Sequence, residues 1–177
     1  MARHVRSAMM RGRQSFCGLA LLLLGGLAVA GSLDGLVALE LRDQFGHTDS
    51  LARQSGAPVI VVVVGVRRLA LIEAWERDLT RRLPGVRFLN VADLPVDVPV
   101  DLDRTAATLR KRVPQGILVL MDPARQWATT LALDTGLPNL LVFDGRGQLL
   151  ARFRGRWSEP LAATVASAVP VAPETGP

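Results

Sequence analysis

The strongest pattern in the sequence is an uninterrupted apolar run from Val59 to Val64, followed at once by a helical pattern. Six β-branched residues in a row are typical of a strand that is buried on both faces of a sheet. After Gly65, apolar positions recur at steps of three and four residues and stop before Gly85, which predicts an amphipathic helix. These positions are Leu69, Ile72, Trp75, Leu79 and Leu83. A buried strand that runs directly into such a helix predicts an α/β domain.

The other apolar segments predict strands and helices in alternation around this unit. Before it, the pattern predicts a strand at Leu36–Leu41 and a turn at Arg42–Gly46. After it, the predicted strands are Val86–Val91, Ile117–Met121, Asn139–Phe143 and Gln148–Phe153, and the predicted helices are Leu102–Val113, Ala124–Leu133 and Glu159–Val169. We therefore expect a mixed central sheet with helices on both faces, and a closing antiparallel hairpin.

Polar residues and prolines mark where these helices should begin. Asp101 or Asp103 can cap the helix at Leu102, and Ser158 can cap the last helix. Asp122 followed by Pro123 combines an N-cap acid with proline at the first helical position. Both residue types are common at helix starts, so these positions support the predicted boundaries.

Residues 1–30 have the pattern of an export signal. Four arginines and no acid precede an apolar stretch, Phe16–Gly31, that contains Ala28-Val29-Ala30 near its end. This combination predicts a secretory signal peptide cleaved after Ala30. The stretch is just short of a membrane span, so an uncleaved anchor is the alternative. In both cases we expect the body of the protein to be exported, periplasmic or extracytoplasmic, with membrane contact only if the segment is retained.

The rest of the chain predicts one domain, residues 31–169, and a disordered tail, residues 170–177. The formal charge of the whole chain is +5, and it falls to +1 when the four arginines of residues 1–30 are removed. The basic character thus belongs largely to the targeting segment. No aromatic cluster is visible either, so we expect no nucleic acid as a partner.

Three pieces of the sequence resemble the thioredoxin-like superfamily, in its exported redoxin or TlpA-type branch. The first is Asp43–Gly46 (DQFG), followed by Leu51 and Gly56-Ala57-Pro58. The second is the central strand that feeds a long helix. The third is the block Gly136–Gly147 (GLPNLLVFDGRG). The resemblance covers roughly residues 36–169 and implies a thioredoxin-like sheet with an inserted strand–helix unit at residues 117–133. It also implies that Pro138 is cis and faces the ancestral active site.

The sequence differs from that family at the position of the redox-active cysteines. Alignment without gaps places Leu69-Ala70-Leu71-Ile72 at the position of the two redox cysteines. The only cysteine, Cys17, lies in the targeting segment. Thiol–disulfide exchange and peroxide reduction by the peroxiredoxin route require a thiolate, so we expect no catalytic residue of this type.

Four residues mark a possible partner- or anion-binding edge. Arg67 and Arg68 follow the carboxyl end of the central strand, where open α/β sheets bind ligands and where a helix N-terminus favours anions. Pro138 and Asn139 would lie beside them and could pair with an extended peptide. The alternatives are that the arginines are solvated and pair with neighbours such as Asp93, and that Pro138 is only a structural turn.

The sequence predicts no cofactor and no metal. His47 is the only histidine after residue 30, too few for a zinc site, and we expect it at the surface. The acidic run Asp93, Asp97, Asp101 and Asp103 lacks the glycine of a calcium loop and predicts a solvated loop. Trp75 is expected in the core, and Trp157 half exposed.

Three functions remain open at this point. The first is a non-catalytic accessory module that binds an unidentified protein or peptide. The second is a redoxin-type oxidoreductase that acts only with a partner's thiol. The third is a structural subunit of a membrane assembly. The absence of cysteine from residues 31–177 favours the first.

Overall fold

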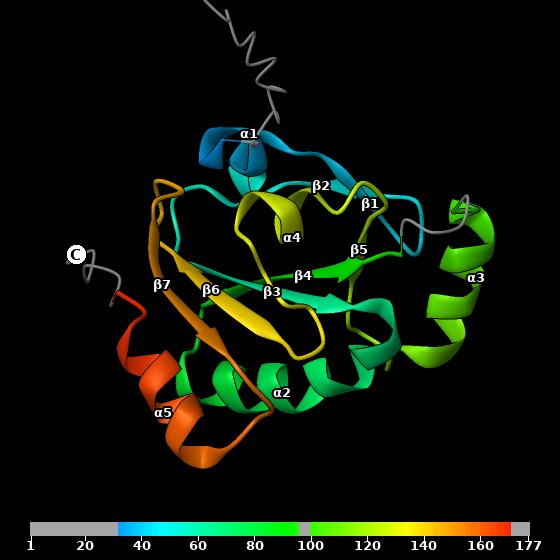
Figure 1. The fold of residues 1–177 in the computed structure, drawn as a ribbon. Coiled ribbons are helices and arrows are strands. Elements are labelled where there is room, and N and C mark those ends of the chain that lie inside the picture. Colours follow the sequence, from blue (N-terminus) through cyan, green and yellow to red (C-terminus); the bar gives the residue numbers. More distant parts are fainter. Residues whose placement is uncertain (1–31, 96–99, 171–177) are drawn as a thin grey trace, which may run out of the picture.

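A seven-stranded mixed sheet forms the centre of the part of the chain that the computed structural model describes, residues 32–95 and 100–170 (Figure 1). The predicted signal segment with Cys17 and all of the predicted tail except Pro170 lie outside the described residues. The strand order is β2-β1-β5-β4-β3-β6-β7. The strands are β1 (Leu41–Asp43), β2 (Thr48–Asp49), β3 (Val59–Gly65), β4 (Arg87–Asp93), β5 (Val119–Asp122), β6 (Asn139–Phe143) and β7 (Leu149–Arg154).

The central strand β3 is where the predicted mixed sheet changes direction. It runs parallel to β4, which is parallel to β5, and antiparallel to β6, which forms the predicted hairpin with β7. Residues Val59–Val64 are all 0–1% exposed. Burial on both faces explains why this strand carries no polar residue.

Helices cover both faces of the sheet, as predicted (Figure 1). On one face, α2 (Ile72–Arg82), α3 (Leu102–Arg112) and α5 (Glu159–Ser167) contribute to a core cluster with alternate side chains of β3, among them Val62 and Val64. On the other, α1 (Leu33–Ala38) and α4 (Gln126–Thr130) contribute to a second cluster with Val61 and Val63. The alternation of side chains along β3 thus builds two separate cores.

The long helix after β3 has the predicted apolar stripe but a different beginning. Leu69, Ile72, Trp75 and Leu79 are buried. However, the chain first forms a 3-10 helix, η2 (Val66–Leu71), and becomes α-helical only at Ile72. Arg67 and Arg68 therefore lie in η2, before the α-helix begins.

The prediction of a strand at Leu36–Leu41 is wrong. Residues Leu33–Ala38 form α1, and β1 begins only at Leu41. The Ser32 Oγ accepts a hydrogen bond from Gly35 N at 3.0 Å and caps the helix. A single buried side chain in this helix, Leu36, fixes it to the second core. An N-cap and one apolar contact therefore outweigh the loose alternation of the sequence.

The helix predicted at Ala124–Leu133 is shorter, α4 (Gln126–Thr130). Asp122 does hold its start, since its Oδ2 accepts a hydrogen bond from Trp127 N at 2.9 Å. Arg125 and Ala132, just before and after the helix, have φ angles of 54° and 50°. This left-handed backbone is incompatible with a continued right-handed helix and limits α4 to five residues.

Other boundaries follow the sequence closely. Asp101 is the N-cap of α3, and its Oδ1 accepts a hydrogen bond from Arg104 N at 3.0 Å. Ser158 is the N-cap residue of α5, although its side chain makes no capping hydrogen bond. Within the described ranges, no helix has the length and apolar character needed to cross a membrane.

Candidate functional site

At the carboxyl end of β3, the backbone at Gly65 lies close to the backbone at Thr135. Gly65 N donates a hydrogen bond to Thr135 O at 2.8 Å. A Cβ atom at Gly65 would lie 3.1 Å from the same oxygen, so glycine suits this contact better than any other residue. The contact places Thr135 and Gly136 opposite the start of η2, and the two segments form the walls of a hollow.

We call this cavity of about 310 Å³ the edge hollow. It is lined by residues 65–68 and 93–95 and by Arg125, Thr135 and Gly136. Arg67 and Arg68 are exposed, and neither forms an ion pair with any residue that the structure describes. The structure therefore brings the two predicted arginines to a concave site in which no described carboxylate pairs with them.

The acid of this hollow, Asp93, binds Arg125 and Thr135 and not Arg67 or Arg68. It is 6% exposed, and its carboxylate accepts hydrogen bonds from Arg125 Nε and Nη2 at 2.8 and 3.0 Å. It also accepts one from Thr135 Oγ1 at 2.5 Å. The prediction that Asp93 lies in a solvated loop is thus wrong, because it is the last residue of β4 and not part of the following loop. Its ionic partner is Arg125, which the sequence analysis did not single out.

Asp122 lies beside Asp93 on the neighbouring parallel strand, in direct register. It is 1% exposed, and its Oδ1 has no hydrogen-bond partner among the described residues. Burial raises the pKa of Asp122, and the backbone N–H of Trp127 offsets this only in part, while the nearby Asp93 raises the pKa further. The carboxyl ends of two adjacent strands therefore carry one acid that is paired with Arg125 and one acid whose pKa is raised by burial.

Replacing Asp122 with asparagine tests this assignment. Because the folded-state pKa is raised, the neutral carboxyl contributes stability that is present below the ordinary pKa of aspartate and is lost as pH rises through the folded-state pKa. We therefore expect the free energy of unfolding of Asp122→Asn, relative to that of the wild type, to increase as the pH rises from about 3 to about 7. Chemical denaturation at several pH values measures this difference. The exposed control Asp103→Asn should show no such trend. A difference between Asp122→Asn and wild type that is constant with pH would contradict the assignment.

Pro138 and Asn139, the other two predicted edge residues, are buried and do not line the edge hollow. The Asn139 side-chain amide donates to the carbonyl oxygens of Asp134 and Leu137 at 2.9 and 3.1 Å and lies 3.3 Å from that of Val63. These contacts tie the loop before β6 to β3. The structure therefore gives Asn139 a role in holding the wall of the hollow.

The expected cis peptide bond before Pro138 is not present, since every described peptide bond is trans. The Asn139 amide bonds the Leu137 carbonyl, and the Pro138 carbonyl accepts a hydrogen bond from Gly155 N at 3.0 Å. These contacts stabilise the loop in the trans form, which an X–Pro bond also prefers intrinsically. The prediction taken from the family resemblance is wrong at this position.

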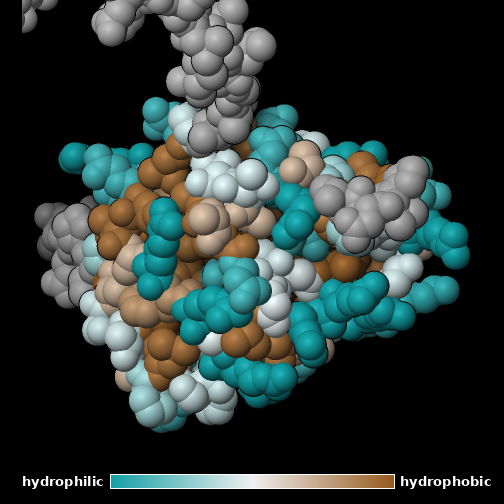
Figure 2. All heavy atoms as spheres, viewed as in Figure 1, coloured by the Kyte–Doolittle hydropathy of each residue, from teal (hydrophilic) through white to brown (hydrophobic). Residues whose placement is uncertain are grey.

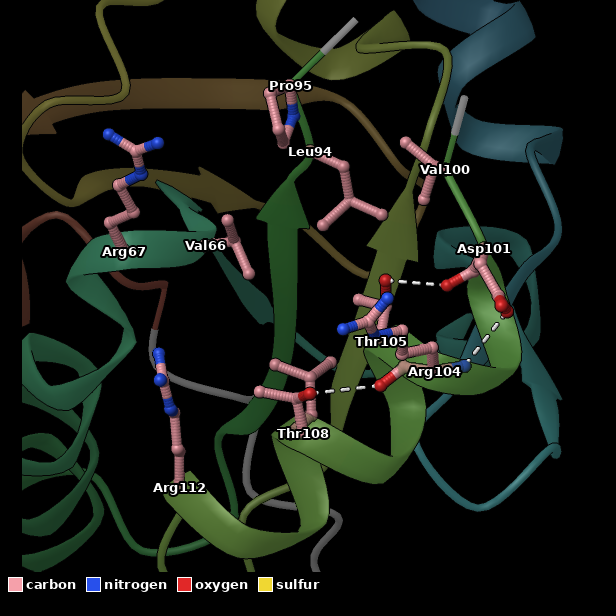
Figure 3. Close-up of a pocket in the computed structure, with 11 residues that line it drawn as sticks. Val66, Arg67, Leu94, Pro95, Val100, Asp101, Arg104, Thr105, Thr108 and Arg112 are labelled. Atoms are coloured by element: carbon pink, nitrogen blue, oxygen red, sulfur yellow. Dashed lines mark hydrogen bonds between the residues drawn. The ribbon is translucent and has the colours of Figure 1, made fainter. Parts of the chain in front are cut away.

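A second cavity of about 400 Å³ adjoins the edge hollow, and we call it the α3 hollow (Figure 3). The two share Val66, Arg67, Leu94 and Pro95. Val66 and Leu94 lie between Arg67 of η2 and Arg104 of α3, while Arg112 of α3 lies on the same side of the view as Arg67 (Figure 3). Figure 2 shows small hydrophobic areas next to hydrophilic side chains on the side of the molecule that carries α3.

The sequence analysis missed the α3 arginines, although a signal was present. Arg104, Thr108 and Arg112 are spaced four residues apart and so share one face of the helix. Both arginines are exposed, and neither forms an ion pair with a described residue. Only the fold could show that this face lies across from Arg67.

The site contains no group for redox or metal chemistry among the described residues. Leu69 and Ile72, which align with the missing cysteines, are buried in the core. No group of three or more potential metal ligands occurs in the described ranges. The side chain of His47 is 78% exposed, as expected, and its Nδ1 lies 3.2 Å from Asp43 Oδ2. The chemistry available at the two hollows is therefore that of guanidinium groups, hydrogen bonds and apolar contact.

Comparison with solved structures confirms the fold. The chain is similar to the pneumococcal exposed lipoprotein thioredoxin Etrx1 from Streptococcus pneumoniae, with a TM-score of 0.62 and 16% identity over 74% of this chain and 98% of that one. It is also similar to a secreted Mycobacterium tuberculosis disulfide oxidoreductase homologous to E. coli DsbE, with a TM-score of 0.53 and 13% identity over 76% and 96% of the two chains. Xanthomonas campestris peroxiredoxin Q gives a TM-score of 0.52 and 14% identity over 76% and 92%.

No protein-family model matches the sequence, and no curated protein matches it. At 13–16% identity, the structural likenesses show that the fold is thioredoxin-like, as the motifs at Asp43–Gly46 and Gly136–Gly147 predicted. They show the fold alone, since one fold serves many functions.

Proposed function

We propose that this protein is an exported, non-redox member of the thioredoxin-like fold that binds a protein or peptide partner at the edge hollow. The observation that carries the proposal is that the carboxyl end of β3 has exposed arginines and no redox cysteine. No cysteine follows residue 17, and the hollow is lined by two exposed arginines that have no carboxylate partner among the described residues. The export pattern of residues 1–30 supports a partner in the cell envelope or outside it.

The position of the hollow supports binding at this edge. Ligands of open α/β sheets bind outside the carboxyl ends of the strands, where the connections diverge. Here β3 and β4 end side by side at Gly65 and Asp93. The Arg125–Asp93 ion pair and the Gly65–Thr135 contact hold the walls in place before any ligand arrives. Such preorganisation lowers the entropy cost of binding.

Affinity capture tests the proposal. The exported form, immobilised and exposed to an envelope extract of its own cell, should retain a specific partner that Arg67→Glu/Arg68→Glu fails to retain. Arg87→Glu/Arg146→Glu is a matched control, because it makes the same charge change at the opposite end of the sheet, where both arginines are exposed. Retention of the same partner by both double variants would contradict the proposed site.

The absence of thiol chemistry is tested in parallel. We expect no insulin-disulfide reduction and no peroxide consumption above the buffer rate, because a thiolate is required for both. The Cys17→Ser variant should behave like wild type. A rate above buffer that persists in Cys17→Ser would overturn the proposal in favour of an enzyme.

A further inference from the structure

We propose that the partner presents an acidic segment with a large apolar side chain, and that this segment lies across both the edge hollow and the α3 hollow. The proposal rests on the proposed function and adds the chemistry of the ligand and the surface that it covers. It also assigns the α3 arginines, Arg104 and Arg112, to the binding of that segment.

Charge is the first argument. Among the described residues, five arginines and two aspartates line the two hollows, a formal excess of three positive charges. These residues are Arg67, Arg68, Arg104, Arg112, Arg125, Asp93 and Asp101. Both aspartates already accept hydrogen bonds, Asp93 from Arg125 and Asp101 from the backbone N–H of Arg104. The remaining four arginines have no ion pair with a described residue. Carboxylates of a ligand would relieve the repulsion among these guanidinium groups.

The apolar floor is the second argument. In the α3 hollow, Leu94 and Leu109 are buried at 2% and 1% exposure, and Val66 and Val100 are partly exposed beside them. A cavity of about 400 Å³ with an apolar base has room for one large side chain. An apolar anchor inside a charged rim is the arrangement of a protein–protein interface with its polar edge and hydrophobic centre. The ligand must therefore combine both kinds of side chain.

Continuity is the third argument. Val66, Arg67, Leu94 and Pro95 belong to both hollows, so the two form one groove along the carboxyl ends of β3 and β4 and the flank of α3. A groove of this form fits a peptide segment. A membrane surface would touch the exposed arginines without filling the space between them. None of the lining residues is aromatic, so the groove offers no stacking for nucleic-acid bases.

Selection from a random library of twelve-residue peptides tests the ligand chemistry without knowledge of the partner. The full exported chain should enrich peptides rich in Asp and Glu that carry at least one Leu, Ile, Phe or Trp. Binding of an enriched peptide, followed by fluorescence anisotropy, should weaken at least about tenfold in Arg104→Glu/Arg112→Glu and on replacing its Glu and Asp by Gln and Asn. The control Arg87→Glu/Arg146→Glu should bind as wild type, and circular dichroism should show that all variants are folded.

Each other outcome overturns the inference in a way that leaves the proposed function open to its own test. Enrichment without acidic bias, or no enrichment, would show that the ligand is not an acidic segment. Equal binding by wild type and Arg104→Glu/Arg112→Glu would confine the site to the edge hollow. Tighter binding to vesicles with phosphatidylglycerol than to any peptide, lost in the same variant, would assign the groove to anionic lipid. Capture of a partner through Arg67 and Arg68 could still succeed in the first two cases.

Discussion

Replacing Trp75 with alanine is expected to lower the free energy of unfolding by about 3–5 kcal/mol. Trp75 is 0% exposed and lies in the core cluster between α2 and the sheet. Its Nε1 donates a hydrogen bond to Gly155 O at 3.3 Å, which ties α2 to the segment between β7 and α5. Truncation would remove the aromatic contacts, leave a cavity and leave that carbonyl without its donor.

Urea denaturation of wild type and variant measures this loss. Leu150→Ala is the control, because Leu150 is 48% exposed on the edge strand β7 and should change stability by no more than about 0.5 kcal/mol. A loss below about 1 kcal/mol for Trp75→Ala would mean that the side chain is not enclosed as the structure describes.

Replacing Asp93 with alanine is expected to cost about 3 kcal/mol, because it removes the acceptor of three hydrogen bonds inside the edge hollow. Arg125 and Thr135 would both lose this partner. The variant should also lose partner binding, since Thr135 and Gly136 form one wall of the hollow.

Two other substitutions show how much of this loss of stability comes from the charge of Asp93 and how much from its size. Asp93→Asn keeps the size of the side chain and one acceptor oxygen, so an intermediate loss is expected. The side chain of Asp103 is 92% exposed, and Asp103→Asn should change stability by no more than about 0.5 kcal/mol. Equal stability of Asp93→Ala and Asp103→Asn, by urea denaturation, would show that the Asp93 cluster does not stabilise the fold.

Trp75 and Asp93 stabilise opposite walls of the edge hollow. Trp75 fixes α2, and η2 leads directly into that helix, so the core determines where Arg67 and Arg68 lie. Asp93 then fixes the opposite wall through Arg125 and Thr135. These two anchors are internal to the fold, so the positions of η2 and of the opposite wall do not depend on a ligand.

The sequence determined the central unit and the class of fold. A run of six β-branched residues allows no solvated face, so Val59–Val64 had to be a central strand, and the stripe from Leu69 to Leu79 had to pack against it. The order of the other segments then predicted the mixed sheet, and the motifs at Asp43–Gly46 and Gly136–Gly147 gave the resemblance to the thioredoxin-like fold. The lack of cysteine after residue 17 excluded thiol chemistry by residues 18–177.

The tertiary structure decided every feature that depends on contacts between distant segments. Asp93 looks like part of an acidic loop in the sequence, but burial at the end of β4 gives it Arg125 as a partner, 32 residues away. Arg104 and Arg112 look like an ordinary solvated helix face until the fold places α3 beside η2. Local periodicity reports which face of an element is apolar. Which charged faces meet across a groove is set by the packing of whole elements, and therefore only the fold could assemble this site.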